Sequence, residues 1–422
     1  MFDNMQQQKA PYFVGLDIGT ANVRCVVGML EQRDNENHLS VIGLGISPNQ
    51  GMRKGTVVHV DEVANSINDA VAEAEHMAGL RINGATINVN GAHVHSQNSH
   101  GVVAISTPDR QISDEDRMRV EEAATIINMP ANREIIQVFP KNYCIDGQDN
   151  IKDPVGMQGV RLEVETLVVT AGTPLLRTLD NALDKAKVPV HNHTVASLAA
   201  AEAVLDRRQK ESGTAVIDIG AGTTNLVILD EGEVEYVAVI SIGSQHLTND
   251  LAIGLKTDLD IAEQVKLKYG TLDFTKPPAD NISIDYEGKK YQFAEKTVRL
   301  VVESRIAELL EQVDREFRKA GKSRKLPGGV VIVGGMANLP GIAEYTRERL
   351  QLPAKTGKVT SVSGIISSVE NPEYATAVGL MMLDMILSEN GSPNTSIITG
   401  SQVTAGLIKK FKKITGRKSS RT

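Results

Sequence analysis

Two short segments of the chain carry an acid, glycines and hydroxyl groups between apolar runs. They are Asp17-Ile-Gly19-Thr20 and Asp218-Ile-Gly220-Ala-Gly222-Thr223-Thr224. Glycine lets backbone N–H groups come close to a phosphate oxygen, and the threonine hydroxyls add further donors. The two carboxylates would repel phosphates directly, but they can hold a Mg²⁺ ion through its water ligands. The pair therefore predicts a phosphate chain between two hairpins, with Mg²⁺ on the side of Asp17 and Asp218.

A third glycine turn follows a run of β-branched residues late in the chain. Its sequence is Val331-Ile-Val-Gly334-Gly335-Met336. Two adjacent glycines allow the backbone to approach a flat group, and beside a phosphate chain an adenine ring is the natural candidate. Asn22 and Asn338, which lie next to these turns, join the candidate nucleotide contacts.

Hydrophobic spacing predicts the elements that must position these turns. Each acidic turn lies between two apolar runs, which predicts strand, tight turn and strand. Helical spacing occurs at 62–80, 174–186, 195–208, 246–254, 260–268, 294–320 and 374–387. Strand candidates lie at 86–91, 101–106, 135–145 and 160–170, around one helix that begins at the N-cap residue Ser113. We interpret this last stretch as an inserted α+β module.

The three turns, in this order and at this spacing, resemble the nucleotide loops of the actin-like ATPase superfamily. The two acidic turns are similar to its first and second phosphate loops, the third turn to its adenosine loop, and Ala375-Thr-Ala-Val-Gly379-Leu to its second connecting helix. The resemblance covers nearly all of residues 12–387. It implies an α/β, two-lobed actin-like (ribonuclease-H-like) ATPase fold, with ATP and Mg²⁺ as cofactors in the cleft.

The inserted module is similar to that of the bacterial FtsA cell-division family. The matching segments are Asn90-Gly91, Gly101–Ser106, Glu134–Val138, Tyr143–Asp146 and Pro154–Leu162, with Gly51-Met-Arg-Lys-Gly55 before them. In that family the module replaces a subdomain of actin and lies on the opposite side of the core. The implied divisions are 12–86, 169–205 and 360–387 for subdomain 1A, 87–168 for the inserted subdomain 1C, 206–247 and 312–359 for 2A, 248–311 for 2B, 388–401 for a flexible linker and 402–418 for a membrane-targeting, C-terminal amphipathic helix.

The resemblance also implies roles for single residues. Gly19, Thr20, Gly222, Thr223 and Thr224 would contact the phosphates, Gly243 and Ser244 would form another phosphate-side turn, Gly334, Gly335 and Met336 would contact the nucleoside, and Asp17 and Asp218 would hold Mg²⁺ through water. Glu263 and Lys266 correspond to the superfamily's ribose and adenine contacts. A solvated i,i+3 ion pair on a helix would have the same spacing, so this alternative stays open.

One position departs from the hydrolysing members of the superfamily. In those members the helix before the second phosphate loop begins with an acid or amide that positions the attacking water. The matching residue here is Ala196, which can orient nothing, and Glu202 lies two turns too late. We therefore expect ATP binding with slow or undetectable hydrolysis, and we assign no catalytic residue.

A basic segment ends an otherwise acidic chain. The formal net charge is −7, yet no acidic residue follows Glu389. The apolar residues Val403, Leu407, Ile408, Phe411 and Ile414 fall within an arc of about 140° on a helix, and Lys409, Lys410, Lys412, Lys413 and Arg417 occupy the rest. This pattern predicts an amphipathic helix in the interface of an anionic membrane. Docking on the protein's own core and a nucleic-acid-binding arm are the alternatives.

A protein of this family would join a polymer to a membrane. The resemblance implies self-assembly into a filament, binding of the FtsZ C-terminal peptide by the region around 256–325, recruitment of other division proteins, and a place on the cytoplasmic face of the cell membrane at the division site. Because one tail would bind lipid only marginally, many tails on a filament would act together. Two alternatives are a scaffold of a pilus or secretion machine and a small-molecule kinase of the same superfamily.

Composition and histidine placement exclude other classes of function. With 4% aromatic residues, no Trp and an acidic body, a nucleic-acid partner is not expected. The two cysteines, Cys25 and Cys144, suit a reducing compartment, and we find neither a secretory leader nor an apolar run of about 18 residues. Two histidine clusters make a metal site conceivable, but neither has a further ligand beside it; they are His93, His95 and His100, and His191 and His193.

Overall fold

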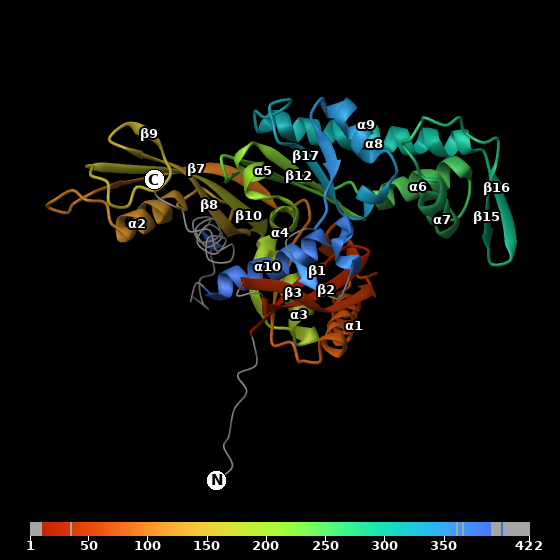
Figure 1. The fold of residues 1–422 in the computed structure, drawn as a ribbon, viewed down its shortest axis with the longest axis horizontal. Coiled ribbons are helices and arrows are strands. Elements are labelled where there is room, and N and C mark those ends of the chain that lie inside the picture. Colours follow the sequence, from red (N-terminus) through yellow and green to blue (C-terminus); the bar gives the residue numbers. More distant parts are fainter. Residues whose placement is uncertain (1–10, 34–35, 360–361, 365–366, 390–397, 400–422) are drawn as a thin grey trace, which may run out of the picture.

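The computed structural model describes residues 11–33, 36–359, 362–364, 367–389 and 398–399. Figure 1 shows two lobes, each built on its own sheet, with a third sheet to one side. The first lobe has a six-stranded sheet in the order β11-β6-β1-β2-β3-β19. These strands are Val190–Val195, Ala85–Val89, Tyr12–Ile18, Asn22–Arg33, Glu36–Pro48 and Ser363–Gly364. The short strands β4 (Met52–Arg53) and β5 (Thr56–Val57) form a separate pair.

Helices cover both faces of the first sheet. α1 (Val60–Ala78) packs on β3 and against α3 (Thr173–Ala186), while α10 (Ala375–Glu389) packs on β1 and against α4 (Ala196–Val204). α1 buries the stripe Val63, Ile67, Ala70 and Ala74 and ends at Gly79, whose φ of 66° is the left-handed conformation that glycine adopts without strain.

The second lobe has a five-stranded sheet in the order β14-β13-β12-β17-β18. These strands are Glu233–Ile240, Thr224–Asp230, Thr214–Ile219, Gly329–Val333 and Ala354–Thr356. Helices α6 (Ser244–Leu255), α7 (Leu259–Tyr269), α8 (Glu295–Lys319) and α9 (Ile342–Leu350) belong to this lobe. A hairpin of β15 (Ile282–Tyr286) and β16 (Lys289–Phe293) lies at its far end (Figure 1).

The predicted inserted module has a sheet of its own, between β6 and α3 in the chain. Its order is β20-β8-β10-β7, with β9 paired to β8. These strands are Ile398–Thr399, Arg133–Ile145, Arg161–Gly172, His95–Ala104 and Gln148–Ile151. Its helix α2 (Asp114–Ala124) begins at a capping box in which Ser113 and Asp116 satisfy each other's backbone N–H groups. The module is joined to both lobes by one apolar cluster that contains Val26, Phe139 and Val227.

Most predicted elements are confirmed, with ends shifted by a few residues. The exception is the helix predicted over 195–208. It stops at Leu205, whose backbone is extended, and a second helix, α5 (Arg207–Glu211), begins from the capping box of Asp206 and Gln209. A good N-cap therefore outweighs the helical propensity of the alanine run.

Several predicted divisions fall on regular structure, among them 86/87 in β6, 168/169 in β10, 247/248 in α6 and 387/388 in α10. The boundary between residues 311 and 312 lies inside α8. The predicted linker 388–401 contains β20, which pairs in parallel with β8 at Gln137 and Val138. The amphipathic segment 402–418 lies outside the described residues. No helix in the described parts of the chain is long and apolar enough to cross a membrane.

Candidate functional site

A cleft of about 370 Å³ lies between the two lobes, within the size range of small-molecule sites. It is lined by most of the predicted nucleotide and metal residues: Asp17, Gly19, Thr20, Asn22, Asp218, Thr223, Ser244, Glu263, Lys266, Gly334, Gly335, Met336 and Asn338. Tertiary structure thus brings together three turns that are far apart in the sequence. Gly222, Thr224 and Gly243 are not part of this lining.

The two acidic hairpins have the same local geometry. In the first, the N–H of Gly19 donates to the carbonyl of Asn22 at 3.0 Å, and in the second, the N–H of Gly220 donates to the carbonyl of Thr223 at 2.9 Å. In both hairpins the acid on the first strand pairs with a polar residue on the second strand: Asp17 is opposite Arg24, and Asp218 is opposite Asn225. The similarity in sequence is therefore a structural repeat.

The two hairpins touch each other across the cleft. A Cβ atom added at Gly222 would lie 2.6 Å from Thr20 Oγ1 and 3.0 Å from the Cα of Lys54. Glycine at 222 is thus explained by the close approach of the two lobes, although its backbone does not line the cleft. The hydroxyl of Thr20 also accepts a hydrogen bond from the N–H of Gly55 at 3.1 Å.

Asp17 and Asp218 are both buried and both face the cleft. Burial raises the pKa of Asp17 to about 7, and the charge of Asp218 adds to the increase, although Arg24 and Asn88 oppose it. Burial also raises the pKa of Asp218 against the lowering effect of the hydrogen bond from Thr376. A carboxyl with a raised pKa favours the folded state while it is protonated. The contribution of Asp17 to stability is therefore largest below its unfolded value of 3.8 and is lost as the pH rises towards 7.

Mg²⁺ fits this end of the cleft. The buried side-chain oxygens Asn90 Oδ1 and Asn225 Oδ1 have no hydrogen-bond partner, and both residues line the cleft. Waters on a cation held by Asp17 and Asp218 could donate to them. Among the residues that the structure describes, no group of three or more His, Cys, Asp or Glu side chains could hold a metal ion without such help.

The spacing of the acids did not indicate Arg24, Asn88 or Thr376. Asn88 donates to Asp17 at 2.6 Å and accepts from the N–H of Ile18 at 2.8 Å, while Thr376 donates to Asp218 at 3.1 Å. Arg24 lines the cleft and forms an ion pair with Glu373 at 3.2 Å. A usable pattern was present for Arg24, because strand pairing across the first hairpin places it opposite Asp17. Asn88 and Thr376 arrive from distant segments.

The third turn lies beside the second hairpin, because the strand that leads into it, β17, pairs in parallel with β12 up to Asp218. Gly334 has a φ of 82°, and a Cβ there would lie 2.5 Å from Asp218 Oδ1, so glycine is required by both conformation and space. A Cβ at Gly335 would meet nothing within 4 Å. The cleft therefore has open room directly against Gly335, where the adenine ring was predicted.

Glu263 and Lys266 form an i,i+3 ion pair that is only partly solvated, because 40% of the Glu263 side chain is exposed. The ammonium of Lys266 donates to Glu263 at 2.6 Å and to the hydroxyl of Thr248 at 2.9 Å, and only 10% of the Lys266 side chain is exposed. Both side chains line the cleft on α7. This arrangement favours the ligand-binding interpretation over a surface ion pair.

The segment Gly243-Ser244 and the side chain of Thr224 form hydrogen bonds that hold the second hairpin. The N–H groups of Ser244 and Gln245 donate to the carbonyls of Gly220 and Ala221, each at 2.9 Å. The hydroxyl of Thr224 donates to the carbonyl of Ile242 at 2.8 Å. These donors hold the second hairpin in place and are therefore already used.

The two positions weighed for water activation lie away from the cleft lining. Ala196 is buried at the start of α4. Glu202 is buried on the same helix and accepts from Lys210 at 2.8 Å. The histidines also have local partners, because His191 pairs with Asp384 at 2.9 Å and His193 with Asp180 at 2.8 Å.

The comparisons with known proteins identify the family. A family model of the cell division protein FtsA matches residues 215–379, and a model of the SHS2 domain inserted in FtsA matches 91–170, the stretch predicted as an inserted module. The chain is 35% identical to the cell division protein FtsA of Pseudomonas aeruginosa, over 91% of this chain and 92% of that protein. This chain belongs to the FtsA family. It is 35% identical to the FtsA of Bacillus subtilis too, over 87% of this chain and 82% of that protein.

Solved structures confirm the actin-like fold of this FtsA family member. The PilM–PilN type IV pilus biogenesis complex superposes with a TM-score of 0.65 at 19% identity, over 88% of this chain and 98% of that one. MreB5 of Spiroplasma citri bound to ADP superposes with a TM-score of 0.52 at 15% identity, over 90% of this chain and 98% of that one. At these identities the likeness concerns the fold alone. The chain is a cell division protein with an actin-like α/β fold and an inserted SHS2 domain.

Binding of Mg²⁺ with ATP in this cleft is expected to weaken as the pH falls through about 7. A carboxylate that holds a metal must be ionised, and the pKa of Asp17 is about 7. We expect about a tenfold loss of Mg²⁺-dependent affinity between pH 8 and pH 6. A fluorescent ATP analogue titrated with and without Mg²⁺ measures it. Asp17→Asn should bind more weakly at pH 8 and depend less on pH than the wild type, and a wild-type profile with the same pH dependence as Asp17→Asn would contradict the assignment.

Proposed function

We propose that this chain binds ATP and Mg²⁺ between its lobes, polymerises, and tethers FtsZ polymers to the cytoplasmic face of the cell membrane at the division site, where it recruits later division proteins. The observation that carries the proposal is the cleft of an FtsA family member in which two matching hairpins hold buried Asp17 and Asp218 beside an open glycine turn. Family membership supports this role over a pilus scaffold or a small-molecule kinase.

Different residues of the cleft would contact different parts of the nucleotide. Gly19, Thr20 and Thr223 would receive the phosphates, with the Arg24 guanidinium supplying positive charge beside the two acids. Glu263 and Lys266 would contact the ribose and base, opposite Gly335 and Met336. Mg²⁺, when bound, would neutralise phosphate charge and let the two hairpins approach one ligand.

Nucleotide hydrolysis would be slow. The position for a water-orienting group holds Ala196, and Glu202 is engaged with Lys210. With no general base placed there, ATP would act mainly as a ligand that holds the lobes together. The nucleotide would thus set the conformation of the subunit and not drive a rapid cycle.

The membrane would be reached through the segment 402–418, which lies outside the described residues. Its apolar stripe of five residues and its six basic residues suit the surface of an anionic bilayer. Each Lys near such a surface contributes about 1 kcal/mol, so one tail binds reversibly and a filament of many subunits binds firmly.

FtsZ would dock on the far end of the second lobe, within 256–325. Among the large apolar side chains that are exposed there or next to it, three lie on helices and outside the cleft lining: Ile253, Leu259 and Leu300. They lie on α6, α7 and α8, which pack against one another. Exposed apolar side chains on a rigid helical surface are typical of a protein-binding site.

The function is tested by asking whether this chain carries FtsZ to a membrane. Purified FtsZ is mixed with vesicles that contain anionic lipid and pelleted with or without the full chain and ATP. We expect most of the FtsZ in the pellet only when the full chain and ATP are both present. The reason is that the chain must bind FtsZ and lipid at the same time. FtsZ lacking its C-terminal peptide serves as the matched control. FtsZ that stays in the supernatant beside a vesicle-bound chain would refute the tether.

A further inference from the structure

The inserted module bridges the two lobes, although the chain connects it to the first lobe alone. It follows β6 and leads into α3, which both belong to the first lobe. Further contacts fix it there. The buried Gln137 on β8 donates to Thr194 on β11 at 2.9 Å and accepts from the N–H of Val195 at 3.1 Å. The module is therefore rooted in the first lobe.

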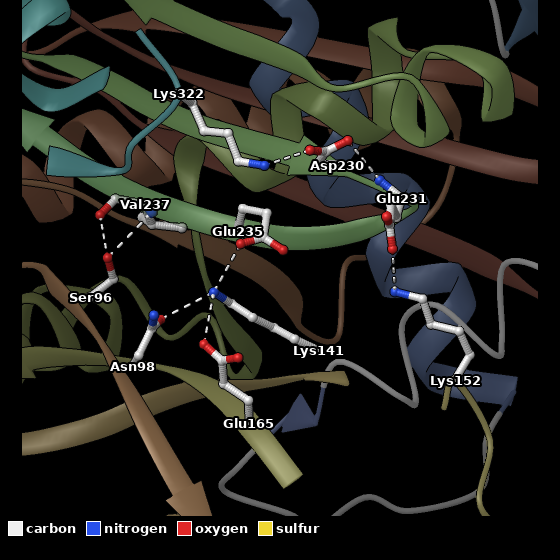
Figure 2. A network of polar contacts seen from close by, with 10 residues as sticks. All are labelled: Ser96, Asn98, Lys141, Lys152, Glu165, Asp230, Glu231, Glu235, Val237 and Lys322. Carbon is white, nitrogen blue, oxygen red and sulfur yellow. Dashed lines mark hydrogen bonds and ion pairs between the residues drawn. The ribbon is translucent and has the colours of Figure 1, made fainter. Parts of the chain in front are cut away.

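The same module also contacts β14, the edge strand of the second lobe (Figure 2). The hydroxyl of Ser96 on β7 donates to the carbonyl of Val237 at 2.6 Å and accepts from its N–H at 3.3 Å. One side chain thereby satisfies both backbone groups of that residue. An open sheet edge would otherwise need water or another strand there.

A buried lysine completes the junction. Lys141 on β8 is only 4% exposed, and its ammonium donates to Glu235 on β14 at 3.0 Å and to Asn98 on β7 at 3.1 Å (Figure 2). Glu165 on β10 of the same module also lies 3.9 Å from this ammonium, so Glu235 is the closer carboxylate and the one that Lys141 gains only when β14 is in place. Lys152 and Glu231 add an exposed pair at 3.2 Å, which contributes little.

β14 is directly bonded to the strand that follows the second phosphate hairpin. Val239 and Ile240 on β14 pair with Asn225 and Thr224 on β13. The junction therefore lies two residues along the strand from the cleft wall. The two hairpins touch at Gly222 and Thr20, so separation of the lobes would widen the cleft around a ligand held between them. Separation would pull β14 away from a module rooted in the first lobe.

We propose that the contacts of Ser96 and Lys141 with β14 form a strut that restrains separation of the lobes and so slows nucleotide exchange. The proposal rests on the nucleotide-binding function proposed above and adds a means of regulating it. Anything that moved the inserted module, such as its packing in a filament, would change how long the nucleotide stays bound.

The test is the release rate of a fluorescent ATP analogue, chased with excess ATP, from the full chain. Lys141→Met and Glu235→Gln should each release it about fivefold faster than wild type, as expected when about 1 kcal/mol of closed-state contact is lost. Lys322→Met is the matched control. Lys322 forms a half-buried pair with Asp230 at 2.6 Å next to β14, but both residues belong to the second lobe, so its release rate should equal that of wild type.

Hydrogen exchange of the unmodified chain is the second measurement. If the junction forms with the closed cleft, adding the nucleotide should slow amide exchange in β14 around Val237, since the coupling is reciprocal. Equal release from Lys141→Met and Lys322→Met, or β14 exchange that the nucleotide leaves unchanged, would overturn the strut while ATP binding stands. A wild-type chain that binds no nucleotide would overturn both proposals.

Discussion

A chain that ends at Gly400 is expected to lose its binding to anionic vesicles, while its lobes fold as before. The truncation removes every residue of the predicted amphipathic segment, including Leu407, Phe411 and Ile414, and seven basic side chains. At about 1 kcal/mol for each basic residue near the surface, plus partial burial of the apolar residues, we expect a fall of at least a hundredfold in vesicle binding of the filament. Co-sedimentation with vesicles in the presence of ATP measures it.

Neutral vesicles and a charge-reduced tail separate the two contributions to membrane binding. The full chain should pellet with anionic vesicles and much less with neutral ones. A full-length chain with Lys409, Lys410, Lys412 and Lys413 changed to Gln keeps the apolar face and three basic residues, so its preference for anionic over neutral vesicles should be much smaller than that of the wild type. If the truncated chain pelleted as well as the full chain, the anchor would have to lie elsewhere in the molecule.

Replacing Gly335 by Val is expected to abolish ATP binding without unfolding the chain. A Cβ at this position points into open space, and the residue lines the cleft, so the new side chain would occupy the room predicted for the adenine ring. Its backbone needs no positive φ, so valine adds little strain. We expect the affinity for a fluorescent ATP analogue to fall at least about a hundredfold, while Gly335→Ala, with a single methyl group, causes a smaller loss.

Thermal unfolding checks that both variants remain folded, and their midpoints should stay close to that of wild type. The same protein preparations report hydrolysis when phosphate release is followed. Wild type should turn over well below the ~10 s⁻¹ of a typical enzyme, because Ala196 and the paired Glu202 leave no group to orient water. If Gly335→Val bound the ATP analogue as well as the wild type, the adenine ring would not lie next to Gly335. Rapid turnover by the wild type would show that another residue activates water.

Local patterns were sufficient for the elements and for most residues of the site. Apolar runs around Asp17 and Asp218 made the two hairpins predictable because strand and turn preferences act over a few residues. The same holds for the open turn at Gly335. Even the break after the alanine helix had a local cause that was available in the sequence, the N-cap Asp206 with Gln209.

What only the tertiary structure decided is which side chains meet across long distances. Asn88 and Thr376 reach the two buried acids from segments far along the chain, and Ser96 and Lys141 meet β14 from the inserted module. No periodicity specifies such contacts, because they depend on how whole sheets pack. The two acids show this difference between what the sequence and the tertiary structure determine. Their sequence placed a carboxylate at each turn, but only burial between two lobes raises the pKa of Asp17 to about 7 and makes it a group whose charge depends on what fills the cleft.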